Sequence, residues 1–180
     1  MPTGASRLGF WSLVEPLPVD YIVVQYVFTD GRDLDSRTKM TIPNVGGDYV
    51  GWDRAHTQGG SIVTWGGDNT GTGVESVLIN LIAYKTAYPA VDTFRMEFNC
   101  FWYGDRGYQP VFLVMTMYTG GKMVKTGFTW TNPTATSTQQ LTSPGKYIIL
   151  NTQNPASNGE PLGYCIFDVE TGAATLNIYP

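Results

Sequence analysis

Two acidic, glycine-rich segments contain the residues of this sequence best suited to bind a metal ion. Residues 29–35 (TDGRDLD) follow a β-branched and aromatic run, and residues 66–75 (GGDNTGTGVE) precede a second such run. Calcium takes about six to eight oxygen ligands from carboxylates, carbonyls, hydroxyls and the backbone. We expect both segments to be loops in which Asp33 and Asp35, two positions apart, reach the same ion. The alternative is that Asp, Asn and Gly only form turns between strands.

The same segments resemble the tellurium-resistance TerD family of small calcium-binding β-sandwich proteins. Residues 33–35 (DLD) match one element of that family, residues 67–73 (GDNTGTG) match its glycine-rich loop, and residues 75–81 match the strand that follows. The resemblance covers roughly residues 21–118 and is specific only at the two loops. It implies a sandwich fold with calcium as the cofactor. The metal ligands that the resemblance implies are Asp33, Asp35, Asp68, Asn69 and Glu75.

The sequence departs from the family at the end of the second loop. The family has a run of consecutive acids there and commonly holds two calcium ions, whereas this sequence is shorter and keeps only Val74 and Glu75. We therefore expect one calcium site at most, or a site rebuilt as a hydrogen-bonded turn. No family pattern is visible after residue 118, which indicates a remote relative used for another purpose.

The other reactive side chains do not form a recognisable catalytic set. His56 is the only histidine, so a Ser-His-Asp or Cys-His arrangement is not indicated. Paired carboxylates for glycoside hydrolysis need a fixed spacing across a cleft, which the sequence does not define. We expect a protein that is not an enzyme and has no catalytic residues. Several aromatic residues either stack on sugar rings or belong to the core: Trp52, Trp65, Tyr103, Tyr108 and Trp130.

Composition excludes several classes of protein. The chain is 42% hydrophobic, which argues against disorder, and 14% charged, against about 25% in soluble domains. The net charge of −4 provides no basic surface for nucleic acid. The first ten residues lack the features of a secretion signal, and no apolar run approaches the roughly 18 residues of a membrane span. Cys100 and Cys165 are expected to be buried small hydrophobes, unless neighbouring strands let them form a disulfide.

The hydrophobic pattern predicts an all-β fold, a two-sheet antiparallel β-sandwich of jelly-roll type, with a closed barrel as the alternative. Residues 94–103 alternate apolar and polar side chains, as a half-buried strand does. No segment has apolar residues at helical spacing, and residues 131–143 are expected to form a long polar loop. The predicted strands are residues 21–28, 74–84, 94–103, 111–118, 122–130, 146–150, 163–169 and 174–179.

Residues 1–20 form a separate segment, an extended N-terminal arm ahead of one sandwich domain over residues 21–180. Glycines and prolines interrupt any period in this arm, while its large apolar side chains require burial. We expect it to contact a partner, either a second copy of the chain or another protein; the alternative is a loose tail. The expected partner-binding residues are Phe10, Trp11, Leu13 and Val14.

These observations favour a structural protein of a larger assembly over an enzyme. The leading expectation is a component of a tailed-phage virion, such as a head decoration, tail or fibre-associated protein, stabilised by calcium. The arm would bind the chain itself or other virion proteins, and the localisation would be the virion. One alternative is a lectin-like module that binds a cell-surface glycan. The other is a cytoplasmic calcium-binding stress protein of the TerD type.

Overall fold

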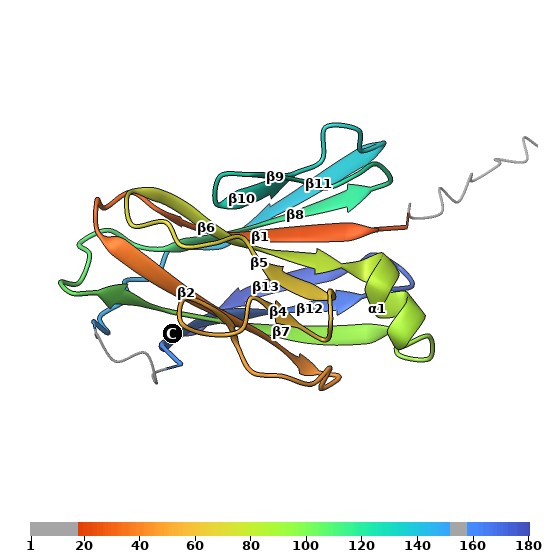
Figure 1. The fold of residues 1–180 in the computed structure, drawn as a ribbon, viewed down its shortest axis with the longest axis horizontal. Coiled ribbons are helices and arrows are strands. Elements are labelled where there is room, and N and C mark those ends of the chain that lie inside the picture. The colour runs from red at the N-terminus through yellow and green to blue at the C-terminus, as the bar shows by residue number, and fades with distance from the viewer. Residues whose placement is uncertain (1–17, 152–157) are drawn as a thin grey trace, which may run out of the picture.

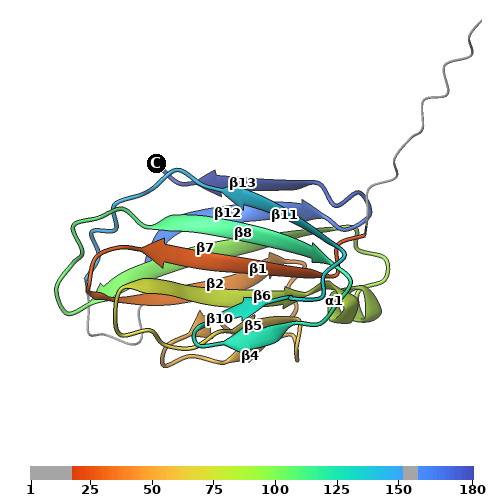
Figure 2. The same ribbon diagram turned by 90° about the horizontal axis from the view of Figure 1, so that it is seen from above.

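The computed structural model describes residues 18–151 and 158–180. Within these ranges the strands form two antiparallel sheets that pack as two layers, together with a two-stranded hairpin (Figure 1 and, seen from above, Figure 2). This architecture confirms the prediction of an all-β, two-sheet antiparallel sandwich. The predicted partner-binding residues of the N-terminal arm lie outside the described residues, so their role stays a prediction: Phe10, Trp11, Leu13 and Val14.

The first sheet has six strands, with the apolar strand β1 near its middle. Strand β1 pairs with β6 on one side and with β8 on the other, and both pairings are antiparallel without a register shift. In spatial order the strands are β11 (Ser137–Thr142), β8 (Phe112–Thr119), β1 (Tyr21–Phe28), β6 (Gly73–Asn80), β5 (Val63–Trp65) and β4 (Thr57–Gln58).

The second sheet has five strands, and β7 is at its centre. Its spatial order is β13 (Ala174–Ile178), β12 (Glu160–Asp168), β7 (Thr93–Tyr103), β2 (Asp33–Ile42) and β3 (Val50–Gly51). The hairpin of β9 (Val124–Thr126) and β10 (Thr129–Thr131) lies against the first sheet. There Gln25 of β1 donates to the Thr129 hydroxyl at 2.8 Å, and Ser76 of β6 donates to the main-chain oxygen of Phe128 at 2.8 Å.

Alternation of side chains along the strands builds the core between the two layers. In β7 every second residue from Phe94 to Trp102 is fully buried in the core. The residues between them project from the opposite face of the sheet, where Asn99 and Phe101 are also covered. Cys100 and Cys165 are both buried and free, as expected for small apolar residues. Aromatic pairs fill the core: Tyr26 with Phe98 and Phe28 with Trp102, both edge to face, and Phe94 stacked on Phe167.

One predicted strand ends early and continues as a helix. The strand expected over residues 74–84 ends at Asn80, and α1 (Leu81–Ala87) follows it. The Asn80 side chain accepts a hydrogen bond from the backbone N–H of Ala83 at 3.1 Å, which caps the helix. Leu81 and Tyr84, three positions apart, are its buried residues. Alternation of apolar residues therefore could not distinguish strand from helix here. None of the described helices could span a membrane.

Two expected loops contain strands. Strand β2 begins at Asp33, inside the segment expected to be an irregular loop, and runs to Ile42. Strand β11 forms within the expected polar loop of residues 131–143 and is an edge strand of the first sheet. Its side chains are mostly exposed and polar, so no apolar alternation marks it. Among the described residues, the expected strand at residues 146–150 makes one isolated bridge, between Val111 and Lys146.

Candidate metal centre

Three aspartates meet at the end of the sandwich opposite α1, where β2 begins. Asp33 and Asp35 lie two positions apart on β2, so both side chains project from the same face of the strand. Asp68 comes from the loop between β5 and β6. One carboxylate oxygen from each lies within 4.8 Å of the others. The aspartates expected from the sequence are thus brought together, although two of them lie on a strand and not in a loop.

The aspartates line a small cavity together with two aromatic residues. Its volume is about 210 Å³, and its lining includes Thr70, Trp52 and Tyr103. The Trp52 and Tyr103 rings are 5.9 Å apart and tilted by 50°. Tyr103 pairs with Asp33 across the β2–β7 ladder, so the sheet register places this ring beside the carboxylates. No sequence pattern marks these three residues as part of the site, and the β2–β7 register that brings Tyr103 there is not visible in the sequence.

Each aspartate presents a buried oxygen that has no hydrogen-bond partner within residues 18–151 and 158–180: Oδ1 of Asp33, Oδ2 of Asp35 and Oδ1 of Asp68. Asp35 is the most deeply placed, with only 2% of its surface exposed. A buried carboxylate without a partner is strongly unfavourable. Three neighbouring carboxylates that each carry such an oxygen are therefore an arrangement that a bound cation would stabilise.

Burial and mutual repulsion raise the pKa values of these carboxyls. The pKa of Asp33 rises to about 6, first because of burial and then because of the charge of Asp68. The pKa of Asp35 rises to about 7, again first through burial and then through Asp33. Burial also raises the pKa of Asp68. Near neutral pH the cluster therefore holds protons more readily than free aspartates do, and a divalent cation would compete with those protons.

A buried arginine lies next to the cluster on the same strand. Arg37 is fully buried, and its Nη1 donates to the main-chain oxygen of Ser36 at 3.1 Å. Its guanidinium lies 5.0 Å from the centre of the Phe101 ring. The charge of Arg37 lowers the pKa of Asp35, which opposes the effects of burial and of Asp33. The positive charge of Arg37 compensates for part of the negative charge of the three aspartates. The negative charge that remains suits one cation.

Glu75, which the resemblance implies as a ligand, is hydrogen-bonded to β2 and to the loop that carries Asp68. It is fully buried at the start of β6. Its carboxylate accepts hydrogen bonds from the backbone N–H and the hydroxyl of Ser36 and from the backbone N–H of Asn69. Burial raises the pKa of Glu75 to about 8, while these hydrogen bonds lower it. Glu75 thus connects β2 to the loop that carries Asp68, and it is not among the clustered carboxylates.

Asn69 also has a structural role, because its side chain stabilises a turn in the loop between β5 and β6. Its side-chain oxygen accepts the backbone N–H of Gly71 at 3.2 Å, and its amide donates to the Val74 carbonyl at 3.3 Å. This is the turn-forming role that Asn often has. Gly66, at the start of the loop, has no room for a side chain, because a Cβ would lie 2.4 Å from the main-chain oxygen of Phe128. Local packing therefore fixes the path of the loop up to Asp68.

The three carboxylates are ligands of the kind that a hard divalent cation such as calcium takes. All the clustered ligands are oxygens, and no His or Cys side chain belongs to the described cluster. Carboxylate oxygens are the preferred ligands of calcium and magnesium, whereas sulfur and imidazole favour zinc or copper. Calcium accepts an irregular shell, which suits three aspartates held by a strand and a loop.

Comparisons with known proteins give no information on the function of this site. No protein-family model and no curated protein matches the chain. Among solved structures, the crystal structure of SAV2460, a protein of unknown function, aligns with 90% of this chain and 88% of that chain. The TM-score is 0.39 and the sequence identity is 9%. A likeness at this level carries no argument, so the resemblance to the TerD family stays a prediction.

Proposed function

We propose that this chain is a non-enzymatic protein of a larger assembly whose acidic site holds one calcium ion. The single observation that carries the cation site is the set of unpartnered buried oxygens on Asp33, Asp35 and Asp68. The ion would join β2 of the five-stranded sheet to the loop before β6 of the six-stranded sheet. Its role is to stiffen this end of the sandwich.

Large exposed apolar side chains support the assembly part of the proposal. Tyr108, Tyr147 and Ile149 are each more than 60% exposed and line one surface cavity of about 190 Å³. Gathered apolar side chains on a surface are typical of interaction sites. The low charged fraction and the apolar residues of segment 1–20 favour a virion as the assembly. Light scattering of the full chain tests this, because an assembly protein forms a defined oligomer and a free module stays monomeric.

Terbium luminescence tests the cation site directly. Terbium replaces calcium in oxygen-rich sites, and Trp52 in the cavity lining is placed to sensitise its emission on excitation of tryptophan. We expect emission that calcium displaces, and calorimetry should give a binding heat for calcium. Asp68→Ala should abolish both signals, whereas Asp105→Ala, at an exposed acid in the loop after β7, should leave both intact.

A second variant separates ion binding from the optical signal. Trp52→Phe should weaken the terbium emission while the calorimetric calcium binding remains. If the wild-type protein gives neither terbium emission nor a binding heat for calcium, the three aspartates do not bind a metal ion. Binding that survives in Asp68→Ala would show that the ion sits elsewhere.

A further inference from the structure

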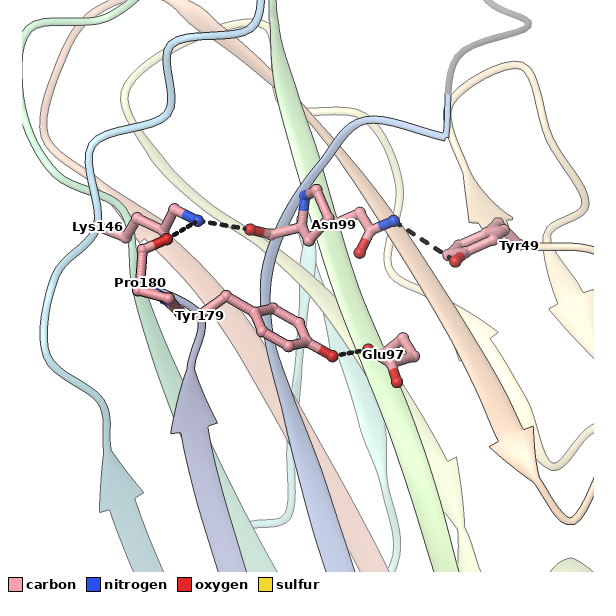
Figure 3. A pocket seen from close by; sticks show the side chains of 7 residues that line it. Tyr49, Glu97, Asn99, Lys146, Tyr179 and Pro180 are labelled. Carbon is pink, nitrogen blue, oxygen red and sulfur yellow. Dashed lines mark hydrogen bonds between the residues drawn. The ribbon is translucent and has the colours of Figure 1, made fainter.

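A second polar groove lies on the outer face of the five-stranded sheet, apart from the acidic site. Its volume is about 440 Å³, within the range of about 300–1,000 Å³ of small-molecule sites. Glu97 and Asn99 rise from β7 two positions apart, so both project from the outer face. Tyr49 reaches them from one side and Tyr179 from the other, as Figure 3 shows.

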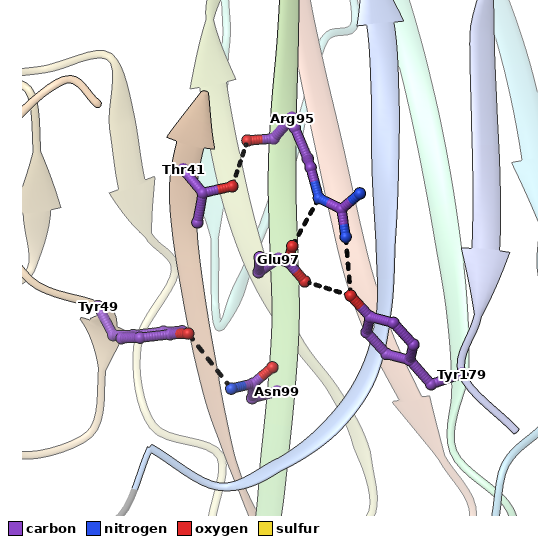
Figure 4. A network of polar contacts seen from close by, with 6 residues as sticks. All are labelled: Thr41, Tyr49, Arg95, Glu97, Asn99 and Tyr179. Atoms are coloured by element: carbon purple, nitrogen blue, oxygen red, sulfur yellow. Dashed lines mark hydrogen bonds and ion pairs between the residues drawn. The ribbon is translucent and has the colours of Figure 1, made fainter. Parts of the chain in front are cut away.

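Hydrogen bonds hold the polar groups of this groove in place. The Tyr179 hydroxyl donates to Glu97 at 2.9 Å and accepts from Arg95 at 2.8 Å, and Arg95 also donates to Glu97 at 2.6 Å (Figure 4). The Arg95 guanidinium lies 3.8 Å from the centre of the Tyr164 ring, which fixes it further. Groups fixed in this way lose little freedom on binding a ligand, so the groove is preorganised.

Asn99 and Glu97 together form the floor of the groove. Asn99 is only 6% exposed, and its amide donates to the main-chain oxygen of Asn158 at 3.0 Å. The same amide approaches the Tyr49 hydroxyl at 3.5 Å, the long limit of a hydrogen bond. At the rim, Lys146 donates to the main-chain oxygens of Pro161 and Pro180, which holds the chain next to Tyr179. A deeply placed amide therefore lies between two tyrosines whose positions are set by their neighbours.

The charges of the groove favour an uncharged ligand. The two charged residues of its lining, Glu97 and Lys146, have opposite signs. Glu97 is paired with Arg95 at 2.6 Å, and Lys146 lies 3.9 Å from Glu160. Both charged residues of the lining are therefore compensated, and the nearby charge of Lys39 lies against the Tyr49 ring, 5.6 Å from its centre. What the groove offers is a mixture of donors and acceptors: a carboxylate, an amide and tyrosine hydroxyls.

We propose that this groove binds a neutral saccharide. Sugar hydroxyls both donate and accept hydrogen bonds, which matches the mixed floor of Glu97 and Asn99. The C–H faces of a sugar ring pack on aromatic rings, and tyrosine combines an apolar ring with a polar tip. Tyr49 and Tyr179 provide these walls on the two sides of the floor. The proposal does not depend on the calcium site, whose residues belong to a different cavity.

An NMR titration of the full chain with a panel of neutral hexose and N-acetylhexosamine oligosaccharides tests the groove. We expect at least one member to shift the amide signals of Tyr49, Glu97, Asn99 and Tyr179, in calcium and in chelator alike. Tyr49→Ala and Glu97→Gln should each weaken binding roughly tenfold, because each removes a wall or a hydrogen-bond partner. Tyr118→Ala is the matched control, since Tyr118 is half-buried like Tyr49 but lies on β8 of the other sheet, outside the groove.

Each other outcome overturns the proposal. Shifts that cluster instead around Asp33, Trp52 and Asp68 and require calcium would place saccharide binding at the acidic site. Shifts caused by a peptide panel, but by no saccharide, would make the groove a protein-binding surface. Unchanged binding in both Tyr49→Ala and Glu97→Gln, with spectra that show both variants folded, would exclude the groove as the site. No shift with any saccharide at saturating concentration would also refute the assignment.

Discussion

Replacing Asp35 with Asn removes one negative charge from the buried cluster while keeping the shape of the side chain. The folded pKa of Asp35 is about 7, against 3.8 for a free aspartate. At about 1.36 kcal/mol per pKa unit, this difference of roughly three units corresponds to about 4 kcal/mol at most. The folded state binds the proton more tightly than the unfolded state. The stability that protonation of Asp35 contributes is therefore fully present below about pH 4 and is lost as pH rises to about 7.

The measurement is the unfolding free energy between pH 5 and pH 8, from denaturant titration and calorimetry, in chelator and in excess calcium. In chelator, we expect wild-type stability to fall as pH rises through this window. At pH 8, Asp35→Asn should be more stable than the wild type by up to about 4 kcal/mol, or about 8–16 °C in Tm for a chain of this size. Asp105→Asn, at an exposed position, should leave the pH dependence unchanged.

Calcium should reduce the stability difference between the wild type and Asp35→Asn at pH 8. Bound to the folded state alone, calcium at a hundredfold excess over its Kd adds about 2.7 kcal/mol to the wild type. The gain should be largest at pH 8 and small at pH 5, where protons occupy Asp33 and Asp35. Asp35→Asn should gain little at either pH. Wild-type stability in chelator that rises from pH 5 to pH 8, or a calcium gain equal at both, would refute the reasoning.

Three further predictions concern the residues around the site and the arm. Glu75→Ala should lower the unfolding free energy by about 1–3 kcal/mol, because the backbone N–H of Asn69 and the N–H and hydroxyl of Ser36 lose their buried acceptors; urea denaturation measures the loss, and unchanged stability would contradict the role of Glu75. Gly66→Ala should destabilise the fold by about 1–3 kcal/mol and weaken terbium binding, whereas Gly71→Ala, whose nearest contact is at 3.8 Å, should do neither. Deleting residues 1–18 should leave a folded monomer by light scattering, and a truncated chain that still forms the full oligomer would show that the arm is only a tail.

The apolar strands could be predicted from the sequence because their pattern is local. Residues 21–28 form β1 with those bounds, and the alternation over residues 94–103 marks β7 to within one residue. Strand β2 was missed because its residues at the site are polar although buried, and burial depends on partners elsewhere in the chain. Strand β11 was missed because an edge strand with exposed polar side chains carries no apolar signal.

The site could be predicted in part, for the same reason. Asp33, Asp35 and Asp68 stand in recognisable motifs and do converge. The motif could not show that Glu75 turns toward Ser36 in the other sheet, because that contact spans 39 positions. No pattern in the sequence marks the groove proposed to bind a saccharide. Tyr49, Glu97 and Tyr179 belong to three segments that only the order of the second sheet brings together.

The connection from Glu75 to Ser36 has a consequence for folding kinetics. Glu75 belongs to one sheet and Ser36 to the other, so the acidic site is complete only after the two layers have packed. An ion held there acts late on the folding pathway, where it stabilises the native state more than the transition state. Calcium would then slow unfolding and leave the folding rate nearly unchanged. The ion would thus increase the kinetic stability of the protein, because the folded form would unfold more slowly.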